Sequence, residues 1–361
     1  MTTIALTGGG TAGHITPMRA VGESLLAAQP DTSLVIIGTE AGREKQLLPE
    51  GFGDIVEVQK LPFPRSLSMD ALRFPRRFSR AVSSLRHHFR ERSVDVVAGF
   101  GGYVAAPAYV AAWREKIPLV IHEANALPGL ANRLGARLTS HVATCFPGTP
   151  LPHHVTIGMP LPRHIVDMDQ EALAPEGYTF FGLDPAQPVL LITGGSSGAK
   201  KLNEALVEAV PRIVKRGWQV LHLVGPSLEV PQAMPGGYVA VDYCQQMELA
   251  YAVADMVISR AGAATVSELA IAGLPAILVP YHVGNGEQHR NARFLVKEGA
   301  ALVVNQADVT PAYIDSVVLP LLDDRVQRDR MGQAAKRVAF TDAAERFADM
   351  VWAAREVASS C

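Results

Sequence analysis

Two glycine-rich segments are the parts of this sequence best suited to hold a phosphorylated ligand. Residues 8–13 read GGGTAG after an apolar run, and residues 194–198 read GGSSG after another. Glycine lets a backbone turn tightly and approach a diphosphate, whose charge then meets the free N–H groups and the positive end of a following helix. A dinucleotide site, a sugar-nucleotide site and a structural turn all use such a loop, so it does not separate them.

The first segment also fits the GxGxxG pattern of nicotinamide-dependent oxidoreductases. Such an enzyme needs an acidic ribose ligand about 20 residues further on, at the end of the second strand. The nearest acid is Glu40, which lies 40 − 13 = 27 residues beyond Gly13. This spacing disfavours the oxidoreductase but leaves it open.

Two side chains are candidates for a general base. His14 directly follows the first glycine segment, where an imidazole can take a proton from an attacking hydroxyl; an ordinary histidine at a helix start is the alternative. Glu123 belongs to the sequence HEAN, which ends a predicted strand, and ligands collect outside the carboxyl ends of strands in open α/β sheets. Residues 99–103, GFGGY, end the preceding predicted strand and are expected at the same place.

A third strand-to-helix junction is predicted at residues 260–268, RAGAATVSE. Small residues, then hydroxyls, then a carboxylate suit a loop that surrounds a nucleotide, with Glu268 accepting from ribose hydroxyls. The alternative is helix capping, with Thr265 or Ser267 at the N-cap and Glu268 in the first turn.

No metal or cofactor site is predicted. Asp167 and Asp169 have DxD spacing but lie in a polar segment away from any predicted strand end, and we interpret them as a solvated pair. Cys145, Cys244 and Cys361 lie far apart without CxxC spacing, which favours neither a disulfide framework nor a zinc site and fits a reducing cytoplasm.

The elements that must position these residues alternate between strand and helix. Eight apolar runs without period-two alternation predict strands buried on both faces, and hence an α/β fold with parallel sheets. They are residues 4–6, 34–37, 94–98, 119–121, 189–192, 220–224, 256–258 and 276–279.

The chain of 361 residues is long enough for two domains, and each glycine segment is expected to open one of them. A segment rich in proline, glycine and histidine at 147–162 places the boundary near residue 160. We therefore expect domains at 1–160 and 161–340. Residues 341–361 carry helical apolar spacing and are predicted to pack back on either domain.

One stretch departs from the modest net charge of −2. Residues 60–92 hold nine basic residues against Asp70 and Glu91: Lys60, Arg65, Arg73, Arg76, Arg77, Arg80, Arg86, Arg90 and Arg92. Apolar residues recur there at helical spacing, at Phe74, Phe78, Val82, Leu85 and Phe89. A cationic helix with one apolar face is typical of a segment that lies on an anionic membrane; the alternative, which the sequence alone favours slightly, is a helix that packs on a core and leaves its basic face to solvent.

Other partners are not indicated. No recognised nucleic-acid motif accompanies the basic stretch. The N-terminus MTTIALTGGG lacks a charged leader, and the most apolar stretch, residues 269–281, is too short to span a bilayer, so we expect a cytoplasmic protein.

Six motifs in this order give a family resemblance that covers most of the chain. They are GGGTAGH with Pro17, GFGGYVAAPA, HEANALPGLANR, TGGSSGAKKLN, SRAGAATVSELAIAGLPAILVPY and GEQHRNA. Together they resemble the MurG family, transferases that convert lipid I to lipid II of peptidoglycan synthesis at the cytoplasmic face of the membrane. The resemblance implies the two-Rossmann-lobe glycosyltransferase B fold, with UDP-N-acetylglucosamine as donor and a polyprenyl-diphosphate-muramoyl-pentapeptide as acceptor. It also implies a peripheral protein, and inversion at the donor sugar without a metal.

The resemblance carries over site residues by motif position. Donor contacts are expected from Thr11, Ala12, Gly13 and Asn125 in the first lobe, and from Arg163 on the uracil side, although one extra residue precedes this arginine. In the second lobe they are expected from Ser196, Cys244, Ala263, Ala264, Thr265, Val266, Ser267, Glu268 and Gln288. His14, Tyr103, Glu123 and Asn203 match positions near the reaction centre. This chain has Ala12 and Ala124 where the family usually has Gly and Gln.

The expected chemistry is a single displacement, with His14 as the first candidate base and Glu123 as the second. Other classes stay open at this point: a diacylglycerol glycosyltransferase, a UDP-sugar epimerase, the oxidoreductase, and a nucleotide-binding scaffold without catalysis.

Overall fold

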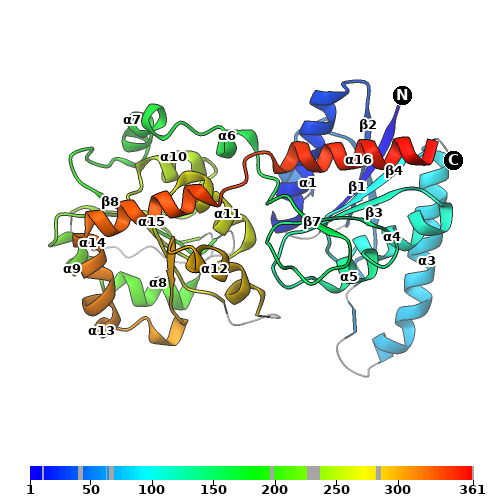
Figure 1. Ribbon diagram of the computed structural model, residues 1–361. Coiled ribbons are helices and arrows are strands. Elements are labelled where there is room, and N and C mark those ends of the chain that lie inside the picture. Colours follow the sequence, from blue (N-terminus) through cyan, green and yellow to red (C-terminus); the bar gives the residue numbers. More distant parts are fainter. Residues whose placement is uncertain are drawn as a thin grey trace. The chain divides into compact units, whose positions relative to one another are not determined.

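A computed structural model describes residues 1–9, 12–39, 44–61, 63–64, 69–195, 199–225, 236–281 and 286–359 (Figure 1). The chain forms two compact units. The first comprises Met1–Pro162 together with Asp342–Cys361, and the second is Arg163–Thr341.

The first unit is built on a sheet of seven parallel strands in the order β3-β2-β1-β4-β5-β6-β7. The chain therefore moves outward from β1 to β3, then crosses back to add β4 on the other side of β1. The strands are β1 (Thr3–Thr7), β2 (Ser33–Thr39), β3 (Asp54–Val58), β4 (Val96–Gly99), β5 (Leu119–Glu123), β6 (His141–Thr144) and β7 (His154–Thr156).

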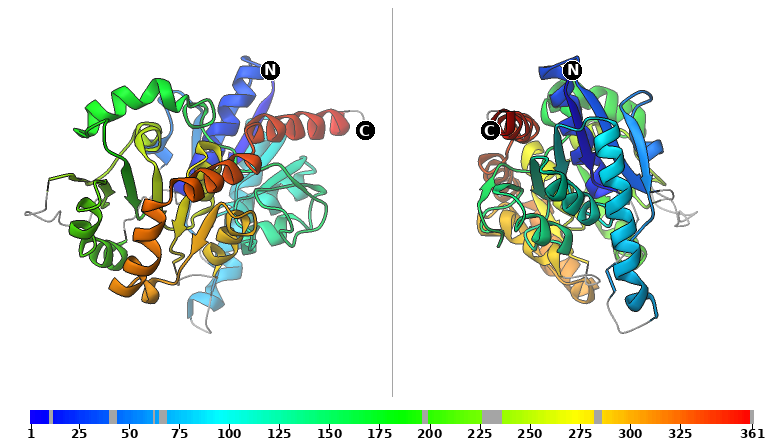
Figure 2. Two further views of the ribbon diagram at one scale, coloured as in Figure 1. Left: turned by 60° about the vertical axis from the view of Figure 1, so that its left-hand side comes forward. Right: turned by 90° about the vertical axis from the view of Figure 1, so that its right-hand side faces the viewer.

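Helices cover both faces of this sheet. They are α1 (Ala12–Ala28), α2 (Glu44–Leu47), α3 (Met69–Glu91), α4 (Ala105–Glu115), α5 (Leu130–Gly135) and α16 (Ala343–Ser359). Successive strand residues point to opposite faces, so Ala5 packs in the core below α3 and α4, whereas Ile4 and Leu6 pack with α1 and α16. The right-hand view of Figure 2 shows α3 and α16 on opposite sides of the sheet. This two-sided burial explains the continuous apolar runs of the sequence.

The C-terminal helix α16 returns to the first unit after the chain has completed the second. Phe347, Ala348 and Val351 are buried there, as the apolar spacing predicts. The Phe347 ring lies 5.3 Å from Phe100 and 5.8 Å from His122, measured between ring centroids. The last helix therefore supports the residues at the ends of β4 and β5.

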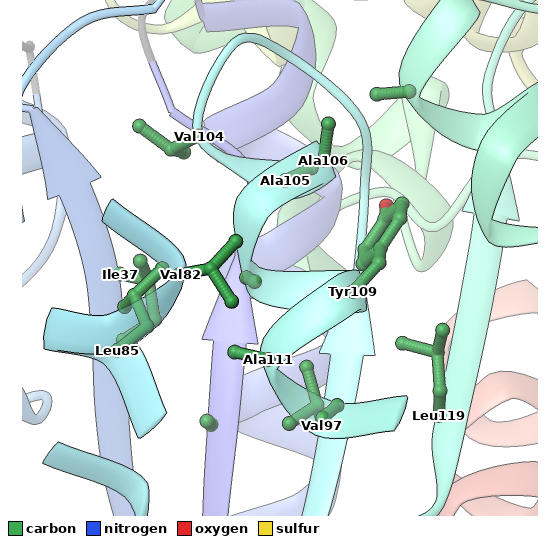
Figure 3. Packing of buried hydrophobic residues seen from close by; sticks show 14 of the residues in the cluster. Ile37, Val82, Leu85, Val97, Val104, Ala105, Ala106, Tyr109, Ala111 and Leu119 are labelled. Carbon is green, nitrogen blue, oxygen red and sulfur yellow. The ribbon is translucent and has the colours of Figure 1, made fainter. Parts of the chain in front are cut away.

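The apolar face of the basic helix α3 packs on the core of the first unit. Val82, Leu85 and Phe89 are buried, and Phe74 and Phe78 pack against the same cluster. Figure 3 shows Val82 and Leu85 close to Ile37 of β2. The interpretation of this face as a membrane-lying surface is therefore wrong, because the sheet covers it; the basic side of the helix is the part left exposed.

The second unit repeats the plan with six parallel strands in the order β10-β9-β8-β11-β12-β13. They are β8 (Val189–Thr193), β9 (Gln219–Leu223), β10 (Tyr238–Val241), β11 (Met256–Ser259), β12 (Ala276–Leu278) and β13 (Ala301–Val303). The order again reverses beside its first strand, here between β8 and β11.

Shorter helices surround this second sheet. They are α6 (Arg163–Val166), α7 (Gln170–Phe181), α8 (Lys200–Val207), α9 (Val210–Val214), α10 (Met247–Val253), α11 (Ala263–Ala272), α12 (Glu287–Lys297), α13 (Pro311–Tyr313), α14 (Leu319–Asp323) and α15 (Arg325–Arg337), with a 3-10 turn at Gln306–Asp308 and a π-helical turn at Ile314–Val318. None of the described helices is both long and apolar enough to cross a membrane.

Candidate functional site

Each sheet has one point where its strand order reverses, and the predicted chemistry gathers at these two points. In the first unit, β1 leads into the first glycine segment and β4 into residues 100–104. In the second unit, β8 leads into Gly194 and Gly195, and β11 into Arg260, Ala261 and Gly262. Ligands of doubly wound α/β folds bind in the crevice at such reversals.

In the first unit the loops after β1 and β4 touch so closely that only glycine fits. A Cβ on Gly8 would lie 2.9 Å from the Phe100 Cβ, and one on Gly102 would lie 2.6 Å from the Gly9 carbonyl oxygen. Gly101 and Gly102 also have φ of +85° and +87°, a region that side chains disfavour. The GFGG sequence is therefore required by the backbone whether or not a ligand binds.

His14 lies in the first turn of α1, against this paired loop. A Cβ on Gly101 would lie 3.4 Å from the imidazole Cε1, and one on Gly102 would lie 3.4 Å from Cδ2. Burial lowers the pKa of His14, and a backbone hydrogen bond with Phe100 opposes that shift. The imidazole is therefore neutral at pH 7, the state in which it can accept a proton.

Glu123 ends β5 and is 3% exposed. Its Oε1 accepts from the Asn125 backbone N–H at 2.9 Å; its Oε2 accepts from the Gly129 N–H at 3.0 Å and from Asn132 Nδ2 at 2.9 Å. Burial raises the pKa of Glu123, and these donors oppose the rise. Both carboxylate oxygens are therefore engaged in holding the loop between β5 and α5.

The Glu123 network continues to Tyr109 on α4. Asn132 Oδ1 accepts from the Tyr109 hydroxyl at 2.8 Å, and that hydroxyl accepts in turn from the Gly101 N–H at 3.2 Å. The Tyr109 ring is buried, and burial raises its pKa far above the usual range. Figure 3 shows the side chain beside β4 and β5. One chain of hydrogen bonds thus links the loop that contacts His14 to the loop that follows β5.

The remaining candidates of the first unit have more varied surroundings. Tyr103 is exposed, with Lys60 Nζ 5.4 Å from its ring centroid. The Asn125 side chain also hydrogen bonds with Glu123. Gly13 is exposed in the first turn of α1, which starts at Ala12. Thr11 lies outside the described residues.

In the second unit, α11 begins directly after β11 with Gly262 as its N-cap residue and no side-chain cap. The capping alternative for Thr265 and Ser267 is therefore wrong, because both residues lie inside the helix. Its first amides, from Ala263 onward, precede the first helical hydrogen bond, in which the Val266 N–H donates to the Gly262 oxygen. These amides and the helix dipole favour an anion.

Glu268 lies one turn further along α11, where it is partly exposed. Its Oε2 accepts from the Tyr251 hydroxyl of α10 at 2.7 Å. Burial raises the pKa of Glu268, and the Tyr251 hydrogen bond opposes the rise. Within the described part of the chain, this is the one hydrogen bond to the Glu268 side chain.

Two other candidates of the second unit, Gln288 and Asn203, hydrogen bond with backbone groups near the strand ends, and a third, Cys244, is buried. Gln288 Oε1 accepts from the Tyr281 N–H at 2.9 Å and from the Ala261 N–H at 3.3 Å, which leaves its Nε2 to donate elsewhere. Asn203 Nδ2 donates to the Val224 carbonyl at 2.9 Å. Cys244 is buried, and burial raises the pKa of its thiol.

The residues outside these loops include Arg163, Ser196 and the aspartate pair. Arg163 is the first residue of α6 and is exposed, 3.5 Å from Asp167 Oδ1. Asp169 Oδ1 accepts from the Ala172 N–H and caps α7. Ser196 lies outside the described residues, and among those that are described no cluster of three His, Cys, Asp or Glu could hold a metal ion.

Two family models match the chain in sequence. A glycosyltransferase family 28 N-terminal domain matches residues 4–144, and a family 28 C-terminal domain matches residues 189–347. A UDP-N-acetylglucosamine--N-acetylmuramyl-(pentapeptide) pyrophosphoryl-undecaprenol N-acetylglucosamine transferase of Clavibacter sepedonicus is 47% identical over 352 residues, which is 97% of this chain and 96% of that protein. The chain belongs to the MurG family.

A second relative of the same name, from Streptomyces coelicolor, is 43% identical over 97% of this chain and 98% of its own length. The crystal structure of Acinetobacter baumannii MurG superimposes with a TM-score of 0.79 at 28% identity, covering 98% of this chain and all of that one. The predicted family and its two-sheet glycosyltransferase B fold are both confirmed.

Fold alone would not have separated MurG from the other candidate classes. A UDP-GlcNAc 2-epimerase of Neisseria meningitidis has a TM-score of 0.69 at only 14% identity, covering 98% of this chain and all of that one, so the similarity shows a shared fold and nothing more. Full-length sequence similarity is what distinguishes the MurG family here.

Three residues make contacts that the sequence did not suggest. Asn132 is part of HEANALPGLANR, and an amide nine residues after Glu123 on an expected helix was the available signal. Tyr109 and Tyr251 gave none, because their partners come from other elements.

Proposed function

We propose that this chain transfers N-acetylglucosamine from UDP-N-acetylglucosamine to an N-acetylmuramyl-(pentapeptide) pyrophosphoryl-undecaprenol acceptor. The 4-hydroxyl of the muramyl sugar attacks the donor anomeric carbon, UDP leaves, and lipid II forms. The full-length identity of 47% to a transferase of this name carries the proposal. The glycine segments and Glu268 lie at strand-order reversals, as a nucleotide-sugar enzyme of this fold requires.

The second unit holds the nucleotide in this proposal. The uncapped start of α11 faces a diphosphate, Glu268 accepts from the ribose hydroxyls, and Gln288 donates from Nε2 to the donor. Charge that develops on the leaving diphosphate is stabilised by such fixed N–H groups. Ser196, Cys244 and Arg163 are further candidate donor contacts of this unit, and Asn203 is a candidate residue near the reaction centre.

His14 is the proposed general base. The imidazole is neutral, so a ring nitrogen can accept the proton of the acceptor hydroxyl. Glu123 is the weaker candidate because both of its oxygens already accept hydrogen bonds. We assign Thr11, Ala12, Gly13, Tyr103 and Asn125 to the donor and acceptor contacts around His14.

Release of UDP, measured with and without a soluble acceptor analogue, tests this function. Acceptor-dependent UDP release supports the transferase. UDP release that does not need the acceptor would indicate hydrolysis or epimerisation. Stabilisation of the protein against heat by NADH but not by UDP would indicate an oxidoreductase. Binding of UDP without turnover would indicate a nucleotide-binding scaffold without catalysis.

We further propose that the protein acts at the cytoplasmic face of the membrane through the basic side of α3. Arg73, Arg76 and Arg80 are exposed and make no ion pair with described residues, and Leu72 beside them is 76% exposed. Such a surface attracts anionic headgroups by about 1 kcal/mol per basic residue. An acceptor on a lipid carrier makes this contact useful.

Vesicle sedimentation tests the membrane contact with a matched pair of variants. Arg73→Glu/Arg80→Glu reverses two exposed charges seven residues apart on α3, and Arg330→Glu/Arg337→Glu does the same on α15. We expect the first variant alone to lose binding to anionic vesicles. If both variants bind anionic vesicles equally well, the basic side of α3 is not the membrane-binding surface.

A further inference from the structure

Tyr251 is a buried side chain that hydrogen bonds with one of the candidate donor contacts, Glu268. It is 1% exposed on α10, and its hydroxyl donates to Glu268 Oε2 at 2.7 Å. Burial and the neighbouring Glu268 carboxylate raise the pKa of the Tyr251 hydroxyl, so it stays protonated and donates. A phenol buried against a carboxylate is costly unless the hydrogen bond is made, so the pair is held together.

The backbone of Tyr251 is itself fixed by α7. Gln170 Nε2 donates to the Tyr251 carbonyl oxygen at 3.3 Å. Gly177 lets α7 approach α10 closely, since a Cβ there would lie 2.6 Å from Val253 Cγ1 and 2.9 Å from the Leu249 oxygen. These contacts with α7 therefore hold Tyr251 in place beside Glu268.

The Glu268 carboxylate can accept further hydrogen bonds besides the one from Tyr251. Tyr251 binds one oxygen, and the other has no hydrogen bond from the described residues. A ribose presents two neighbouring hydroxyls, which need acceptors in a defined plane. A glutamate side chain with free rotation loses entropy when it adopts that plane, whereas one already held by a donor does not.

We propose that Tyr251 is a positioning residue that orients Glu268 to accept hydrogen bonds from the ribose hydroxyls of the donor nucleotide. This inference rests on the proposed function, in which Glu268 contacts the ribose. Tyr251 touches neither the sugar nor the reacting atoms. It acts through Glu268, so it governs the affinity for ribonucleotides and leaves the chemical step unchanged.

The test compares UDP with 2′-deoxy-UDP by calorimetric titration of the full chain. Wild-type protein should bind UDP about tenfold more tightly, the value of one hydrogen bond to a charged group. Tyr251→Phe keeps the ring and removes the hydroxyl; it should weaken UDP binding about tenfold and bring the ratio of the two affinities close to one. In turnover assays it should raise KM for the donor and leave kcat unchanged.

Two further variants separate positioning from general stability. Tyr238→Phe is the control, because it removes a half-buried tyrosine hydroxyl in the same unit that hydrogen bonds with His222, and it should keep the wild-type ratio. Gln170→Ala loosens the Tyr251 backbone without altering the ring, and should lower the ratio by a smaller factor. It remains informative if Tyr251→Phe does not fold.

The outcomes distinguish the inference from the function beneath it. If the wild-type protein binds neither nucleotide, the proposed function fails. If it binds both but Tyr251→Phe and Gln170→Ala keep the wild-type ratio, Tyr251 does not position Glu268 and the inference is overturned. If Tyr238→Phe lowers the ratio as much as Tyr251→Phe, the effect is general and the inference is likewise overturned.

Discussion

Two glutamates, one in each unit, have similar burial effects but different hydrogen bonding. Burial raises the pKa of both Glu123 and Glu268. Glu123 accepts from two backbone amides and the Asn132 side chain, so both oxygens are engaged, whereas Glu268 accepts from Tyr251 alone among the described residues. A carboxylate whose acceptor sites are filled holds structure, and one with sites left can bind a ligand.

The difference follows from where each residue lies. Glu123 ends a central strand, and the chain turns back over it so that Asn125 and Gly129 donate to its oxygens. Glu268 projects from α11 after the helix has formed, and among the residues that the structure describes only Tyr251 of α10 donates a hydrogen bond to it. The position of each glutamate along its strand or helix therefore decides whether its carboxylate is available to bind a ligand.

The largest expected effect separates the two base candidates. His14→Ala should lower kcat by about 10²–10⁴-fold, the usual contribution of a general base, with the fold unchanged. Glu123→Gln should keep a far larger share of the activity per folded molecule. UDP release at saturating donor and acceptor analogue measures both, and the opposite order would make Glu123 the base.

A second effect concerns stability. Glu123→Gln places an amide NH₂ against N–H donors and should lower the free energy of unfolding by about 2–4 kcal/mol, because buried donors lose their acceptor. Glu268→Gln keeps a carbonyl for Tyr251 and should cost about 1 kcal/mol or less. Urea unfolding of the two variants checks the difference. Equal losses would contradict the contrast in hydrogen bonding.

The pH dependence of the reaction sharpens the role of His14. Burial lowers the pKa of His14 from its usual 6.5, so the imidazole is neutral at pH 7 and becomes protonated only at a pH below 6.5. We expect kcat/KM to be flat near pH 7 and to fall about tenfold per pH unit once the pH drops below the His14 pKa. Persistence of this acid limb in His14→Ala would assign it to another group.

The smallest effect tests the extension of the Glu123 network. Tyr109→Phe removes the acceptor of the Gly101 N–H and the donor to Asn132, which should cost about 1–2 kcal/mol of unfolding free energy. Activity should fall modestly, since the Gly101 loop contacts His14. Thermal unfolding and turnover measure the two effects. If Tyr109→Phe is as stable as the wild type, the two Tyr109 hydrogen bonds contribute nothing to the free energy of unfolding.

The sequence predicts the centre of each sheet better than its edges. All eight expected apolar runs are strands, because burial on both faces requires continuous apolar residues. Five further strands were not expected: β3, β6, β7, β10 and β13. The sequence of β3, DIVEV, begins with an exposed aspartate, and β7 is only three residues long at the sheet edge, so their patterns resemble those of loops.

Contacts between residues far apart in the sequence limit how much of the two sites can be predicted from the sequence. The sequence places His14 after a strand and Glu123 at the end of one, as the structure does. The hydrogen-bond partners of Glu123 and Glu268 come from loops and helices whose positions the sequence does not give. The helical spacing of Phe74, Phe78 and Val82 fits both a core and a membrane, and only the position of the sheet decides between them.

The division of roles between the two glutamates is tested most directly by the thermal shift that saturating UDP gives to Glu123→Gln and Glu268→Gln. A ligand at 100 times its Kd stabilises the folded state by about 2.7 kcal/mol. We predict that Glu123→Gln unfolds at a lower temperature without ligand yet keeps the wild-type UDP shift, whereas Glu268→Gln starts near the wild-type temperature and loses most of the shift. A full UDP shift in Glu268→Gln, together with its loss in Glu123→Gln, would contradict this account.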